Sequence, residues 1–129
     1  MIGPAALLLA QAVAAPVQPS APPMPPADWS TLPELPVAPP AAFDPSGYVR
    51  REVAANRCRP ASTGGLVEVA SPVAVLVDAR GAVQRVVPHA IDCPTVEQYT
   101  AGYVSSMARR ASGLKPGWYR YTMTYRWQG

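Results

Sequence analysis

Few side chains in this sequence have the chemistry of a catalytic or metal site. Cys58, Cys93 and the single histidine, His89, are the candidate metal ligands. A His-x-x-x-Cys spacing with one distant cysteine matches no familiar zinc pattern, and no fourth ligand is apparent. In a small exported domain, two cysteines are more typical of a disulfide, and free thiols are the third alternative. A Cys58–Cys93 disulfide is therefore predicted, and a metal site is not.

Candidate nucleophiles and acid–base groups are equally sparse. Ser105, Ser106 and Ser112 have no evident His–Asp partners, although folding can bring distant groups together. Glu68 and Asp78 bracket one expected strand without any pattern that marks them as an acid–base pair. The sequence therefore predicts a binding or mechanical protein that is not an enzyme and has no cofactor.

The first 44 residues differ in composition from the rest of the chain. Residues 1–15 are mostly apolar and contain Ala12-Val13-Ala14 near their end, a pattern that favours a cleaved signal peptide. A short uncleaved anchor and an apolar cytosolic tail are the alternatives. Residues 16–44 are rich in proline and carry only three charged residues, so we expect a disordered linker. The predicted location is periplasmic, with attachment to the inner membrane if residues 1–15 are retained.

The foldable part, residues 45–129, is basic. All 11 Lys and Arg residues lie there with five acids, so the domain carries a net charge of 11 − 5 = +6. A solvated basic surface is one interpretation, and attraction to anionic envelope material or acidic peptides is another. The basic residues are scattered rather than clustered, which argues against nucleic acid as a partner.

Hydrophobic periodicity predicts an α+β fold with two helices and three strands. Helices are expected over 45–57 and 95–111, where apolar residues recur three or four positions apart. Strands are expected over 73–78 and 82–87, joined by a turn with glycine at its positive-φ position, and over 118–127. Pro72 demotes its site to an edge or a bulge. These elements predict a small three-stranded antiparallel sheet with both helices packed on one face.

The last strand is the candidate binding site, because edge strands pair with extended peptides through main-chain hydrogen bonds. If this strand lies at the edge of the sheet, it offers a template for another strand. If it lies centrally, its aromatic residues simply fill the core. The candidate partner-binding residues are Tyr119, Arg120, Tyr121, Thr122, Met123, Thr124, Tyr125, Arg126 and Trp127.

The order of these elements resembles that of a known family. The segment VAVLVDARGAVQRVVPHAIDCPTVEQYTAGYVSSMARR, followed by WYRYTMTYRW, is similar to the C-terminal domain of the TonB family of energy transducers. The shared pattern is a strand, a D-x-x-G turn, a strand, an amphipathic helix and a final strand, after a proline-rich segment. The resemblance covers about 55 residues strongly and about 84 with the first helix.

The resemblance implies a function and a partner. In the TonB family, the domain binds a short extended segment of outer-membrane transporters by strand addition to its last strand. On this chain the contact strand would be residues 119–127, acting in energised uptake. The alternative is a periplasmic adaptor or structural module of the same fold with no role in transport. A homodimer is a further option, and membrane contact is expected only if residues 1–15 are uncleaved.

Overall fold

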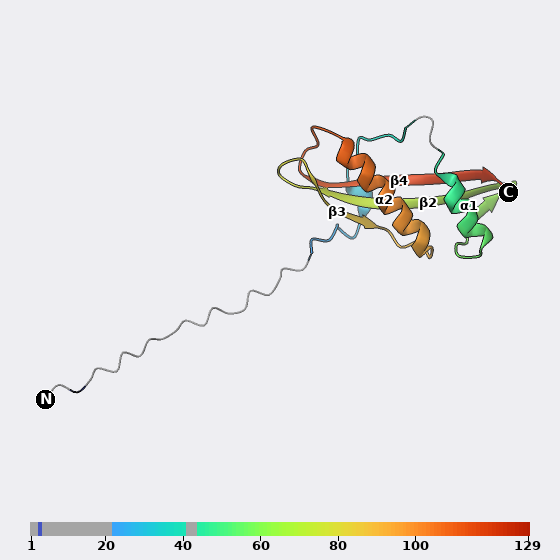
Figure 1. Cartoon of the computed structure of the whole chain (residues 1–129), viewed down its shortest axis with the longest axis horizontal. Coiled ribbons are helices and arrows are strands. Elements are labelled where there is room, and N and C mark those ends of the chain that lie inside the picture. The colour runs from blue at the N-terminus through green and yellow to red at the C-terminus, as the bar shows by residue number, and fades with distance from the viewer. Residues whose placement is uncertain (1–2, 4–21, 41–43) are drawn as a thin grey trace.

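The computed structural model describes residues 3, 22–40 and 44–129, which form one antiparallel sheet with two helices packed against it. The predicted strands are present as β2 (Leu66–Val77), β3 (Val83–Pro88) and β4 (Gly117–Gln128). A three-residue strand, β1 (Ala61–Thr63), was not anticipated. The helices are α1 (Ser46–Ala54) and α2 (Pro94–Arg110). The α+β fold predicted from the sequence is therefore confirmed (Figure 1).

Strand β2 is the centre of the sheet. It pairs with β4 along its whole length, from Leu66 opposite Gln128 to Val77 opposite Gly117. Its other edge is shared by two shorter strands, with β1 at residues 66–68 and β3 at residues 73–77. Pro72 lies between these two pairings, where the N–H that proline lacks is not needed for a ladder. This gap explains why a proline is tolerated in a central strand.

The turn between β2 and β3 is built by one carboxylate. Asp78 Oδ1 accepts hydrogen bonds from the N–H groups of Arg80 and Ala82, at 2.9 and 3.0 Å. Gly81 has a φ of +80°, a conformation that favours glycine. The predicted glycine at a positive-φ position is confirmed. The backbone hydrogen bond at Ala82 is the main cause that lowers the pKa of Asp78.

Both helices cover the same face of the sheet, as Figure 1 shows. At the start of α2, the Glu97 carboxylate accepts hydrogen bonds from the backbone N–H groups of Ile91 and Cys93. The bond from Cys93 satisfies the N–H of the N-cap residue, and the bond from Ile91 holds the preceding loop against the helix. The two helices are joined by the stacked rings of Tyr48 and Tyr99, whose centroids lie 4.5 Å apart. Thr95 Oγ1 also donates to the buried Glu52 carboxylate of α1, at 2.9 Å.

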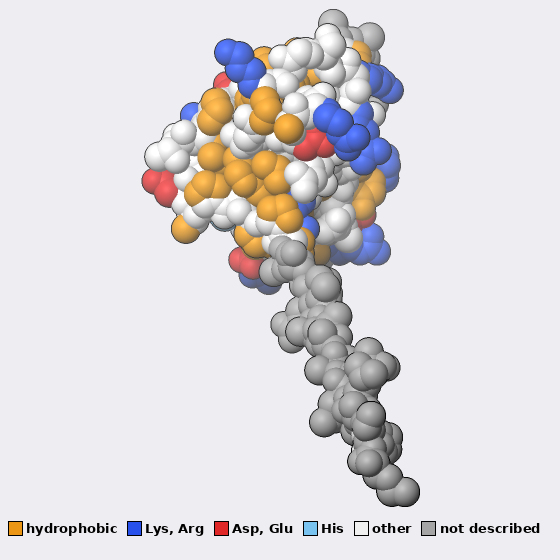
Figure 2. Space-filling view, turned by 90° about the vertical axis from the view of Figure 1, so that its left-hand side faces the viewer, with side chains coloured by type: hydrophobic (Ala, Val, Ile, Leu, Met, Phe, Trp, Pro, Cys, Tyr) orange, Lys and Arg blue, Asp and Glu red, His pale blue; other side chains and the backbone are white. Residues whose placement is uncertain are grey.

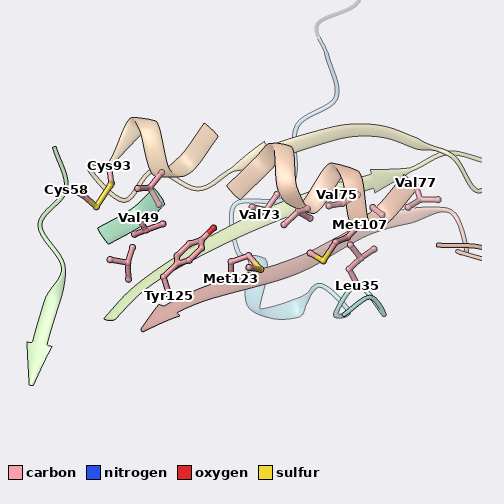
Figure 3. Packing of buried hydrophobic residues seen from close by; sticks show 14 of the residues in the cluster. Leu35, Val49, Cys58, Val73, Val75, Val77, Cys93, Met107, Met123 and Tyr125 are labelled. Carbon is pink, nitrogen blue, oxygen red and sulfur yellow. A yellow bond between two sulfur atoms is a disulfide. The ribbon is translucent and has the colours of Figure 1, made fainter. Parts of the chain in front are cut away.

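The core lies between the helices and this face of the sheet (Figure 3). The strand period of two places Val73, Val75 and Val77 of β2 on the helical side, where all three are buried. Met123 and Tyr125 of β4 are buried on the same side. Each such side chain contributes roughly 1.5–3 kcal/mol to folding through the burial of apolar surface. Strand β4 is therefore held firmly in place through one of its faces.

The described part of the proline-rich region packs against the domain. A short 3-10 helix, η1 (Trp29–Thr31), lies on the side of the sheet opposite to α2 (Figures 1 and 3). Leu32 and Leu35 are buried, and Leu35 belongs to the core cluster. For residues 22–40 this corrects the expectation of a disordered linker. Val37 also packs against this cluster, whereas Met24 is exposed.

The expected signal peptide or anchor, residues 1–15, lies outside the described residues except for Gly3. Residues 16–21 and 41–43 of the expected linker also lie outside them. Within the described ranges, no helix has the length and apolar character needed to span a bilayer.

Candidate functional site

Strand β4 lies at an edge of the sheet, because β2 is its one strand partner in the part of the chain that the structure describes. Near its start, the opposite side is occupied by the N-terminal segment. The N–H of Arg120 donates to the Pro33 carbonyl at 2.9 Å, and the N–H of Leu35 donates to the Arg120 carbonyl at 2.8 Å. Glu34 and Arg120 thus form a parallel bridge. The N-terminal part of the β4 edge is therefore already paired with residues 33–35 of the same chain.

These two bonds define which backbone groups of β4 point away from β2. In an antiparallel pair, successive residues direct their N–H and C=O groups alternately toward and away from the partner strand. Arg120 directs both groups away from β2, and the β2–β4 register is continuous. Thr122, Thr124 and Arg126 must therefore do the same. None of the described backbone groups bonds to these three residues from that side.

The outward-facing residues of this unpaired part of β4 are polar, and the residues between them are anchored in the core. Thr122, Thr124 and Arg126 are exposed, whereas the alternating Met123 and Tyr125 are buried. This alternation gives β4 one solvent-exposed face and one face that is buried against the core. A strand with such anchoring loses little conformational freedom when a second strand pairs with it, since its own backbone is already ordered.

One ion pair lies beside the free stretch. Arg126 Nε is 2.7 Å from Glu68 Oε2 of β2, directly across the strands. Both side chains are largely exposed, so the pair contributes at most about 1 kcal/mol to stability. A partner carboxylate that approaches the edge can exchange with Glu68 at Arg126 at little cost.

The buried end of β4 is fixed by a polar pair inside the core. The hydroxyls of Tyr125 and Thr100 are 2.7 Å apart, and Thr100 Oγ1 also donates to the Val96 carbonyl at 2.8 Å. The Thr100 proton is therefore committed to Val96, so Tyr125 is the donor to Thr100. Burial raises the pKa of Tyr125 to about 12. This pair ties β4 to the middle of α2.

The two cysteines form the predicted disulfide. The Cys58 and Cys93 sulfur atoms are 2.02 Å apart and both residues are buried. The bond joins the segment after α1 to the residue that precedes α2. Among residues 3, 22–40 and 44–129, no group of His, Cys, Asp and Glu side chains is arranged to hold a metal ion. The disulfide fits folding in an oxidising compartment.

The remaining candidate groups of the sequence have structural surroundings. His89 Nδ1 is 3.0 Å from the Ala90 carbonyl, and its ring lies edge-on to Trp29 with centroids 5.2 Å apart. Glu68 and Asp78 are occupied by Arg126 and by the β2–β3 turn. Ser106 and Ser112 are exposed and Ser105 is partly buried, on or just after α2. In the part of the chain that the structure describes, none of these serines forms a hydrogen bond with His89.

Charge and apolar surface are unevenly distributed. Figure 2 shows the end of the molecule that lies on the left in Figure 1, with hydrophobic side chains gathered in the middle and basic groups toward the rim. Among the described residues, Met24 and Leu66 are the large apolar residues with substantial exposure. Met24 belongs to the N-terminal segment, and its sulfur lies 3.6 Å from Nη2 of Arg85.

Sequence reasoning missed the contribution of residues 22–40 to the site. A local signal was present, because Asp28 caps η1 by accepting from the Ser30 backbone N–H at 3.0 Å. Leu32 and Leu35 are also large apolar residues in a region that has few of them, and both are buried. The high proline content of the region outweighed both signals.

Comparisons with known proteins add no relative. No family model matches the chain, no curated protein matches it, and no solved structure matches it. The structure itself shows a small α+β domain with an antiparallel sheet and two helices.

Proposed function

We propose that this chain is a non-enzymatic protein-binding module in which β4 accepts an extended peptide segment by strand addition. The observation that carries this proposal is the free edge from Thr122 to Gln128, where outward-facing backbone groups have no strand partner among the described residues. Such a row of unpaired N–H and C=O groups is a template for another strand. The short bridge at Arg120 supports the idea, because the chain's own segment pairs with β4 in the same manner.

The anchoring of β4 favours a preformed site. Tyr125 is fully buried and hydrogen-bonded to Thr100, so the backbone on either side of it has little freedom. An incoming peptide would supply main-chain hydrogen bonds, and its alternate side chains would face Thr124 and Arg126. Acidic residues on the peptide would complement Arg126 and the net charge of the domain.

The TonB-like order of elements supports a more specific proposal. The strand, D-x-x-G turn, strand, helix and final strand occur here in that order, with the turn at Asp78–Gly81. We infer that the partner is a segment of an outer-membrane transporter and that the protein acts in the periplasm, where a disulfide persists. Mass spectrometry of the native protein tests the location. A mature chain that begins near Ala15 supports export, whereas an intact apolar N-terminus in the cytosolic fraction contradicts it.

A matched pair of variants tests strand addition. Peptides selected from a random phage-displayed library on the full chain serve as the probe. Thr124→Pro removes one outward-facing N–H without breaking a β2–β4 hydrogen bond, and proline is tolerated on edge strands. Thr124→Ala retains the N–H and serves as the control. We expect selected peptides to bind the wild type and Thr124→Ala, and to bind Thr124→Pro at least tenfold more weakly.

Hydrogen exchange locates the binding on the backbone. The amides of Thr122, Thr124 and Arg126 should exchange quickly in the free protein and become protected when peptide is bound. The inward-facing amides of Met123 and Tyr125 should be protected in both states. Unchanged exchange at the three outward amides, or equal peptide affinity of the proline variant, would refute strand addition.

A further inference from the structure

The sheet face opposite to the helices contains a cavity of about 280 Å³ beneath the N-terminal segment. Trp29 and Ser30 of η1 form one wall, and Pro72 of β2 and Thr122 of β4 form the floor. His89 and Arg120 complete the lining. The cavity therefore joins four segments that are far apart in the sequence, and one of them is the proline-rich region.

The Arg120 guanidinium is the distinctive group in this cavity. Its Nε atom is buried and has no hydrogen-bond partner. Among the described residues, no carboxylate forms an ion pair with this side chain. Glu34 lies opposite Arg120 in the bridge, yet the two do not form an ion pair. Asp28, the acid next to Trp29, is occupied by the Ser30 N–H and hydroxyl, at 3.0 and 2.6 Å. Arg120 therefore lines the cavity with no described carboxylate paired to its charge, so this site favours an anionic ligand.

The other residues that line the cavity limit the chemical class of the ligand. A carbonyl oxygen only accepts, so the contact with Ala90 places a proton on His89 Nδ1. Arg120 is the one Lys or Arg residue in the lining, which matches a monoanion better than a dianionic phosphate. A guanidinium binds a carboxylate through two parallel N–H···O bonds. Trp29 and Pro72 offer apolar surface for the body of the ligand.

We propose that this cavity binds a carboxylate, with Arg120 as its anchor and the apolar part of the ligand against Trp29 and Pro72. The ligand is either a small free carboxylic acid or the C-terminal carboxylate of a peptide. Binding here requires no strand addition, because the Arg120 side chain leaves the sheet on its face whereas the free backbone groups lie at its edge. Failure of peptide pairing at β4 would leave this proposal intact.

Nuclear magnetic resonance of the full chain tests the proposal with benzoate as the probe and benzamide as its uncharged analogue. We expect benzoate to shift the Trp29 indole N–H and Arg120 Nε–H signals at millimolar concentration, and benzamide to leave them unchanged. A short peptide with a free carboxyl end is compared with its amidated form to distinguish the two sources. Shifts with the free form alone identify a peptide end, whereas shifts with benzoate alone identify a small acid.

Two arginine variants supply the matched control. Arg120→Gln removes the anchor, and we expect benzoate affinity to fall about tenfold or more. Arg109→Gln removes an exposed cation from α2, on the other side of the sheet and outside the cavity, and affinity should stay within about twofold. If Arg120→Gln does not fold, the shifts of the wild-type Trp29 and Arg120 signals decide the question. No shift with benzoate or either peptide form, equal shifts with benzamide, or full affinity in Arg120→Gln would overturn the proposal.

Discussion

Reduction of the Cys58–Cys93 disulfide should remove a large part of the stability of this domain. The bond joins residues separated by 35 positions, and the closed loop contains β1, β2 and β3. Reduction frees this loop in the unfolded chain, which gains conformational entropy. In the chain-entropy treatment, a loop of this length corresponds to about 4 kcal/mol of stability at 25 °C.

That free energy is large beside the total. Stabilities of about 0.05–0.15 kcal/mol per residue are usual, so a domain of roughly 100 residues has about 5–15 kcal/mol. A loss of 1 kcal/mol lowers the Tm by about 4–8 °C in a domain of 60–100 residues. Reduction should therefore lower the Tm by roughly 15–30 °C. The α1 helix should loosen first, because the bond ties the segment after it to α2.

Thermal unfolding followed by circular dichroism, with and without a thiol reductant, measures this effect. The Cys58→Ala/Cys93→Ala double variant is the control, since reductant should leave its Tm unchanged near that of the reduced wild type. Alkylation of the denatured, unreduced protein should label neither cysteine. A reductant-induced decrease below about 4 °C would refute the reasoning, because it corresponds to less than about 1 kcal/mol.

Two further predictions concern the core. Burial raises the pKa of Tyr125 from 10.0 to about 12, so the folded protein retains a proton that the unfolded chain loses above pH 10. The free energy of unfolding should fall by about 2–3 kcal/mol as the pH rises from 10 to 12, and Tyr125→Phe should reduce that slope in urea titrations; an unchanged slope would contradict the assignment. Leu35 is buried in the core cluster with Met107, so Leu35→Ala should cost about 2–4 kcal/mol in the same assay, whereas Leu35→Met should cost under about 1.5 kcal/mol. A loss below 1 kcal/mol in Leu35→Ala would mean that the N-terminal segment does not pack in solution.

Periodicity predicted the regular elements of this fold well. The α2 helix was expected over 95–111 and spans Pro94–Arg110, and the last strand was expected over 118–127 and spans Gly117–Gln128. Both have long, unbroken patterns in which burial repeats at the period of the element. The first helix was expected over 45–57 but ends at Ala54, because Asn56 adopts a positive φ of 59° that terminates the helix.

Features that depend on tertiary contacts were harder to anticipate. The long β2 contains Pro72, and only the separation of β1 and β3 along its edge shows why this is acceptable. The Thr95 hydroxyl at the start of α2 donates to Glu52 on the other helix, a contact that no local pattern indicates. The candidate binding strand was predicted from its expected edge position and from the family resemblance. The pairing of Arg120 with Pro33 and Leu35 depends on a contact between distant segments that neither indicates.

The bridge between Glu34 and Arg120 also limits the length of a strand that can pair with β4. Residues ahead of Thr122 are closed to a visiting strand while Pro33–Leu35 stay in place, and β4 ends at Gln128. The vacant margin is thus roughly seven residues, or about 23 Å at ~3.3 Å per residue. A partner strand of this length that turns away at its end can pair with the free edge. A longer straight strand would clash with residues 33–35 of this chain.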